Sequence, residues 1–122
     1  MTERPSAPNG PLIPMDGDPM PALTPAALRA AVAQIAPALL PSFVEHLDRA
    51  VEQAATQSTI APLRTFLRWW GEFVAIERCP ARAARLRELE AVAEGAMDRE
   101  ALRSALAEMR QITDLAQREI SA

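Results

Sequence analysis

Residues 61–80, APLRTFLRWWGEFVAIERCP, hold the pattern that decides the fold. The stretch begins next to Pro62, which only the first turn of a helix tolerates, and it ends at Pro80, which a helix does not run through. Between these prolines the apolar residues recur at intervals of three and four, which is the spacing of one helical face. This face comprises Leu63, Phe66, Leu67, Trp70, Phe73 and Val74. The segment predicts a helix from about Ile60 to just before Pro80.

Helix start signals divide the chain upstream of this segment. Thr24 followed by Pro25 is typical of an N-cap with proline at the first helical position. Ser42, with Glu45 three residues later, has the spacing of a capping box. These signals predict a first helix that ends at about residue 36 and a second over about residues 43–56.

Two further helices are expected after Pro80. Gly95 suits a left-handed C-terminal cap of a helix over about residues 81–94, and Asp98 can cap a last helix that continues to about residue 120. The last helix has an apolar stripe that we expect to face the core: Leu102, Ala105, Leu106, Met109, Ile112, Ala116 and Ile120. No stretch alternates with the period of a strand. The fold class predicted is all-α, a compact bundle of about five helices.

The N-terminal residues have a different composition. Seven of the 11 prolines lie at or before Pro25, and each one fixes φ and removes a hydrogen-bond donor. We therefore expect a disordered, Pro/Gly-rich arm over residues 1–23 and a helical domain over 24–122. The apolar side chains of the arm either stay solvated or dock on the domain or on a partner.

Composition excludes several classes of protein. The 122 residues carry 16 acidic side chains against 13 basic ones, a formal net charge of -3, so a generally basic nucleic-acid binder is not expected. One Cys and one His leave too few ligands for a zinc or iron-sulfur site, and no cofactor is expected. We see no signal peptide and no apolar stretch of membrane-spanning length, which predicts a cytoplasmic protein without a membrane partner.

The residues that can carry chemistry do not form a catalytic set. His46 is the only side chain that ordinarily titrates near neutrality, and its neighbours on the second predicted helix include no obvious nucleophile. We interpret His46 as an ordinary histidine on a helix surface. Neighbouring carboxylates such as Glu88 and Glu90 are two residues apart, so they point to different helix faces and cannot act as a pair. No catalytic or metal-binding residue is predicted, and the chain is expected not to be an enzyme.

Trp69 and Ile76 are candidates for binding a partner. If Trp70 faces the core, Trp69 is rotated from it by about 100° and shares a second apolar strip with Ile76 at the i, i+7 spacing. A second apolar strip on one helix needs a second surface that covers it. This is either another helix of the same domain or another protein chain, since tryptophans are favoured interface anchors.

A run of arginines is the other candidate. Arg78, Arg82 and Arg85 follow one another at helical spacing, with Arg87 close by. They can bind phosphate or an acidic partner. Alternatively they form a solvated face with weak ion pairs, because acidic residues such as Glu77 and Glu88 lie near them in the sequence.

Part of the chain resembles a family of short uncharacterised proteins from high-GC bacteria. Its features are a T-P-x-x-I/L-R opening, an acidic helix and an A-P-L-x-x-x-L-x-x-W-W segment, and the resemblance covers about residues 24–95. The most specific positions are Ala61, Pro62, Leu63, Leu67, Trp69 and Trp70. Some members occur beside small ribonuclease-like toxins, which implies an antitoxin or regulatory role. The long last helix is not part of the resemblance and suits dimerisation.

Together these observations predict a non-enzymatic helical module for protein interaction or regulation, in an antitoxin-like form. Its partner is expected to be another protein chain, either a second copy or a toxin-like protein. The alternative is a nucleic-acid-binding regulator of the helix-turn-helix type, in which the face from Arg78 to Arg87 touches phosphates.

Overall fold

The computed structural model describes residues 19–121, so most of the predicted arm lies outside the described residues. The described part contains five α-helices and one 3-10 turn, and no strand. In chain order they are α1 (Pro25–Ile35), η1 (Pro37–Leu39), α2 (Leu40–Gln57), α3 (Ala61–Glu77), α4 (Pro80–Gly95) and α5 (Arg99–Ser121). The prediction of an all-α fold with five helices is confirmed.

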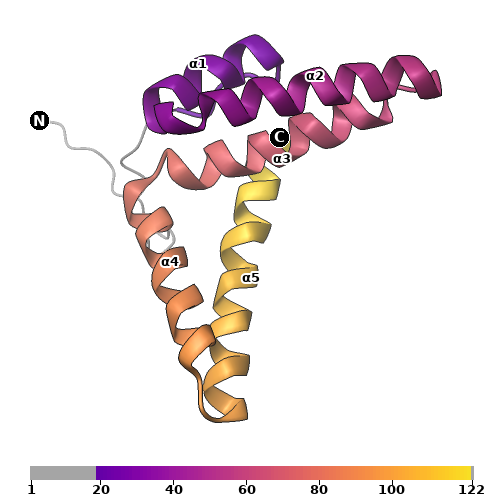
Figure 1. The fold of residues 1–122 in the computed structure, drawn as a ribbon. Coiled ribbons are helices and arrows are strands. Elements are labelled where there is room, and N and C mark those ends of the chain that lie inside the picture. Colours follow the sequence, from indigo (N-terminus) through magenta and orange to yellow (C-terminus); the bar gives the residue numbers. More distant parts are fainter. Residues whose placement is uncertain (1–18, 122) are drawn as a thin grey trace, which may run out of the picture.

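α3 lies between two groups of helices (Figure 1). α1 and α2 pack on one side of it, while α4 and α5 form an antiparallel hairpin that extends from its other side. The C-terminal end of α5 returns to α3. Among the described helices, α4 and α5 contact only each other and α3.

The helix ends are set by local signals, of which sequence reasoning identified some and missed others. The hydroxyl oxygen of Thr24 accepts a hydrogen bond from the Ala27 N–H at 3.1 Å, and a carboxylate oxygen of Asp98 accepts one from the Ala101 N–H at 2.7 Å. Both predicted caps are confirmed. The capping box at Ser42 is wrong, because the 3-10 turn η1 leads directly into α2 at Leu40 and places Ser42 inside the first turn.

The C-terminal caps differ from those expected. Gly95 does not adopt a left-handed conformation; it is the last residue of α4, and the extended Ala96 follows it as the cap. The left-handed cap occurs instead at Ser58, with a φ of 53°, where the Ser58 N–H bonds to the Ala54 carbonyl at the end of α2. A serine pays a steric cost there that a glycine avoids.

The first hydrophobic cluster fills the space between α1, α2 and α3. Its centre is aromatic: the ring of Phe43 meets Phe66 at a centroid distance of 5.1 Å and Trp70 at 5.0 Å, both edge to face. Edge-to-face contacts suit the ring quadrupoles. Leu28, Val32, Ala50 and Val74 complete the buried part.

The second cluster joins the opposite side of α3 to the hairpin. Its buried members are small or medium in size: Ala75, Ile76, Ala83, Leu89, Ala105, Ile112 and Ala116. Gly71 allows a close approach here, because a Cβ at this position would lie 2.6 Å from Leu23 Cδ1 and 3.4 Å from Ile120 Cγ2. The α5 stripe is only partly covered, since Leu102 and Leu106 are exposed.

Candidate protein-interaction site

Trp69 is the large aromatic side chain that α3 leaves in contact with solvent. Its side chain is 54% exposed, whereas the adjacent Trp70 is 3% exposed. The difference follows from helix geometry, because neighbouring residues are rotated by about 100° and only Trp70 points into the first cluster. Trp69 therefore lies at the edge of that cluster.

Other rings hold Trp69 in place. Its indole is stacked with Phe73 at a centroid distance of 6.4 Å and an interplanar angle of 8°, and it meets Trp70 edge to face at 4.7 Å. The imidazole of His46 lies 6.1 Å away. A side chain fixed in this way loses little conformational entropy when a partner covers it.

His46 connects α2 to this aromatic group through a hydrogen bond. The indole N–H of Trp70 donates to His46 Nδ1 at 2.9 Å, so the imidazole must be neutral with its proton on Nε2. Burial lowers the pKa of His46, and the positive charge of Arg49 lowers it further. The interpretation of His46 as an ordinary surface histidine is wrong, because a buried indole N–H requires an acceptor and His46 supplies it. That need in Trp70 is the signal that sequence reasoning missed.

The bond predicts a specific pH dependence of stability. In the unfolded chain His46 takes up a proton near its ordinary pKa of about 6.5, whereas in the folded protein burial and the charge of Arg49 lower its pKa. Protonation on Nδ1 would also break the hydrogen bond from Trp70. The stability that neutral His46 contributes to the folded protein is fully present above about pH 6.5 and is lost as the pH falls through the lower pKa of the folded state.

Between about pH 7 and about pH 5, wild type is expected to lose more free energy of unfolding than His46→Gln, whose amide oxygen accepts the same bond without titrating. Urea denaturation at several pH values measures this difference. Identical pH profiles of the two proteins would contradict it.

Ile76 does not share an exposed strip with Trp69. It is 6% exposed and belongs to the second cluster with α5 residues such as Ala116. The prediction that Ile76 contacts an external partner is therefore wrong, because the last helix of the same chain covers it. Of the two residues, only Trp69 remains available.

Two arginines of the predicted basic face, Arg78 and Arg82, are internal. Arg82 is 3% exposed, and its guanidinium donates to both carboxylate oxygens of Glu119, at 3.0 and 2.8 Å, and to the Ala75 carbonyl at 2.9 Å. Arg78 donates to Glu119 at 2.8 Å. Arg78 and Arg82 thus fasten α5 to α3 and α4, and the prediction that they bind a partner is wrong.

The remaining arginines of the run also have acidic partners. Arg85 donates to Glu108 of α5 at 2.8 Å and to Glu88 at 2.8 Å, and these hydrogen bonds raise its pKa. The same bond to Arg85 lowers the pKa of Glu108. Arg87 contacts Glu77 at 3.5 Å. Ion pairing therefore removes much of the positive charge on which a phosphate-binding face would depend.

Trp69 is thus the one predicted partner-binding residue that the structure leaves well exposed. No family model, curated protein or solved structure matches this chain. The resemblance of residues 24–95 to short proteins of high-GC bacteria stays a prediction. No helix within residues 19–121 is both long and apolar enough to cross a membrane.

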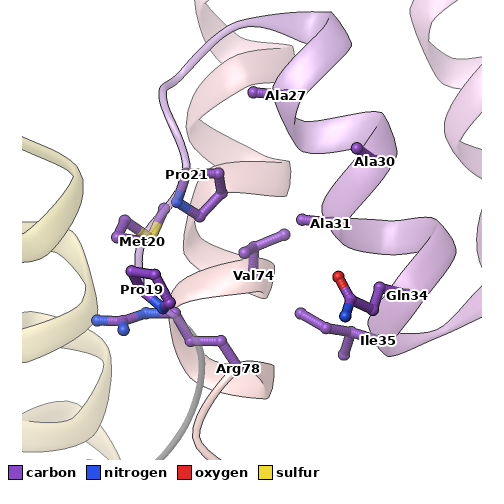
Figure 2. Close-up of a pocket in the computed structure, with 10 residues that line it drawn as sticks. All are labelled: Pro19, Met20, Pro21, Ala27, Ala30, Ala31, Gln34, Ile35, Val74 and Arg78. Carbon is purple, nitrogen blue, oxygen red and sulfur yellow. The ribbon is translucent and has the colours of Figure 1, made fainter.

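A hollow beside α1 was not foreseen from the sequence. It has a volume of about 370 Å³ and lies between α1, α3 and residues 19–21 (Figure 2). Ala27, Ala30 and Ala31 form much of the α1 wall. The guanidinium of Arg78 points away from this wall, toward α5, where it bonds to Glu119. The hollow is thus lined mainly by small apolar groups.

The described residues gather few groups for chemistry. Within residues 19–121 no three side chains of the types His, Cys, Asp and Glu are placed to hold a metal ion. Cys79 is buried at the start of α4. The arrangement of His46 supports the aromatic group rather than a reacting atom.

Proposed function

We propose that this chain is a non-enzymatic helical interaction module that binds another protein through Trp69. The observation that carries the proposal is an indole 54% exposed and yet fixed by stacking on Phe73. Large aromatic side chains that bind with little loss of entropy are typical centres of protein interfaces.

The surroundings of Trp69 support a protein partner. The indole lies at the border of the first cluster, beside the partly buried Phe73 and His46, so a partner that covers it extends an existing hydrophobic core. His46 Nε2 carries the proton when Nδ1 accepts from Trp70, and it therefore offers one donor at this border. A partner that has an apolar side chain next to a hydrogen-bond acceptor can therefore contact both the indole of Trp69 and Nε2 of His46.

The finer form of this proposal is an antitoxin-like or regulatory module. It rests on the resemblance of residues 24–95 to proteins encoded beside toxins.

The alternative, nucleic-acid binding by the face from Arg78 to Arg87, is less favoured because Glu119, Glu108 and Glu77 already pair with these arginines.

Affinity capture from the host with Trp69→Ala as bait tests the proposal. Ile60→Ala is a matched control, because Ile60 is also 54% exposed but lies at the N-terminal cap of α3, more than two turns from Trp69. We expect wild type and Ile60→Ala to retain the same protein, and Trp69→Ala to retain at least about tenfold less of it.

The captured protein, once purified, should also bury the indole of Trp69. A shift of the tryptophan emission of wild type to shorter wavelength on mixing measures this burial. Equal capture by the Trp69→Ala and Ile60→Ala baits would refute the proposal.

A further inference from the structure

The α4–α5 hairpin has a broad face that no other part of the described chain covers. The hairpin extends from α3, and its far half consists of two helices that pack only on each other (Figure 1). Two helices alone can bury one stripe each, and stable helical folds add a further layer. On α5 the apolar stripe is wider than α4 covers, so Leu102 and Leu106 remain 38% and 45% exposed.

The two leucines lie among positive charges. Arg99, Arg103 and Arg110 border them on the same flank of α5 and line a shallow hollow with them. Arg103 reaches Glu100 at 3.8 Å. No ion pair within residues 19–121 joins Arg99 or Arg110 to a carboxylate. This flank therefore suits a partner with apolar groups next to carboxylates.

The hairpin itself presents such carboxylates beside this flank. The Arg85–Glu108 ion pair marks one face of the hairpin. On α5, Leu106 is two residues from Glu108, which is a rotation of about 200° round the helix. On α4, Glu90 is five residues from Arg85, which is a rotation of about 140°. Leu106 and Glu90 therefore both lie on the opposite face, Leu106 on α5 and Glu90 on α4.

The same ion pair fixes the heights of the charges along the hairpin. Because α4 and α5 are antiparallel, equal steps from Arg85 and from Glu108 toward the connecting turn reach the same height. Five steps lead to Glu90 and Arg103, and nine steps lead to Glu94 and Arg99. The face thus has an acidic half on α4 and a basic half on α5 at matching heights.

We propose that this face binds the same face of a second copy, in a two-fold dimer whose hairpins run parallel. A rotation by 180° about an axis along the hairpin puts α4 of each copy over α5 of the other. Glu90 and Glu94 of one copy then face Arg103 and Arg99 of the other, at the same heights. The exposed leucines meet between them, and the four helices form a bundle.

The other two-fold arrangement is disfavoured by charge. Antiparallel hairpins would put α5 over α5 and α4 over α4, so that the arginines face arginines and the glutamates face glutamates. The dimer surface is distinct from the surface at Trp69, so an experiment can contradict one of the two proposals and leave the other unaffected.

The state of association of the purified full chain tests the proposal. Sedimentation equilibrium from micromolar to millimolar concentration should show a dimer for wild type and a monomer for Leu106→Arg. Val92→Arg is the matched control, because Val92 is 48% exposed and lies on the opposite face, seven residues from Arg85. It should remain a dimer. Circular dichroism checks that each variant is folded.

Charge reversal tests the arrangement within the dimer. E90R/E94R turns the attractive contacts into repulsive ones, and we expect the dimer dissociation constant to rise at least about tenfold. Adding R99E and R103E to this variant restores opposite charges across a parallel dimer, and dimerisation should return. In an antiparallel dimer the added changes would restore nothing.

Several results would overturn the proposal. These are a wild type that is monomeric throughout, a dimer that survives Leu106→Arg, or a fourfold variant that stays monomeric. A dimer that dissociates in Trp69→Ala but not in Leu106→Arg would place the interface at Trp69 instead. A monomer that binds vesicles of anionic phospholipid through Arg99 and Arg103 would identify the face as a membrane-binding surface.

Discussion

Replacing Glu119 by glutamine is expected to lower the free energy of unfolding by about 2 to 3 kcal/mol. Glu119 accepts hydrogen bonds from Arg78 and Arg82, whose side chains are only 9% and 4% exposed. Loss of its negative charge removes a carboxylate that both of these buried guanidinium groups contact. Complete burial would raise the cost to about 3 to 5 kcal/mol, but Glu119 is 25% exposed and water screens part of the interaction.

Glu108→Gln provides a matched control on the same helix. Glu108 also pairs with an arginine of α4, but the two side chains of that pair are 40% and 38% exposed. Its loss should cost much less, because exposed ion pairs contribute little. Urea denaturation measures the free energy of unfolding of both variants, and the slope of this free energy against urea concentration should stay unchanged. Equal losses in the two would show that the buried position of Glu119 has no special importance.

The stabilisation by Glu119 should also depend on pH. Burial alone would raise its pKa, but the hydrogen bonds and charges of Arg82 and Arg78 outweigh burial and lower it. The contribution of Glu119 to the free energy of unfolding is therefore present above its ordinary pKa of about 4.5 and is lost as the pH falls through the lower pKa of the folded state. The difference in stability between wild type and Glu119→Gln should shrink accordingly in acid.

Phe66→Ala is expected to cost about 3 to 5 kcal/mol, a large part of the about 5 to 15 kcal/mol that stabilises a typical domain. Phe66 is fully buried, and its ring contacts Phe43 and His46 at centroid distances of 5.1 and 5.0 Å. Truncation leaves a cavity between α2 and α3 that the rigid neighbouring rings cannot fill.

Phe66→Leu should lose less stability, because it removes fewer buried atoms. The fluorescence and near-ultraviolet dichroism of Trp70 should change with Phe66→Ala, since Phe43 packs against both rings. A loss below about 1 kcal/mol for Phe66→Ala would mean that the site collapses without a cavity.

Much of the fold was predictable because its signals are local. The Thr24 cap followed by Pro25 and the Asp98 cap set two helix starts. The apolar spacing in α3 identified Phe66, Trp70 and Val74 as buried. The errors at Ser42 and Gly95 have a local cause as well. Each has the residue type of a cap, but α2 begins before Ser42, so that Ser42 lies inside its first turn, and α4 ends at Gly95 with an extended Ala96 in place of a left-handed glycine.

The candidate site was less predictable because long-range contacts decide it. The sequence of α3 has a second apolar strip, but composition cannot say whether α5 or another chain covers it. The structure covers Ile76 and leaves Trp69 exposed. Arg82 is similar: an arginine in a sequence is expected at the surface, and the carboxylate that permits its burial lies 37 residues away.

The position of α3 between the two hydrophobic clusters has a consequence for cooperativity. Val74 faces one cluster and its neighbour Ala75 faces the other, and both are fully buried. Detachment of either group of helices would expose a side of α3 to water and weaken the helix on which the other group packs. We therefore expect the two groups of helices to unfold together, so that a residue change in either group alters the stability of both.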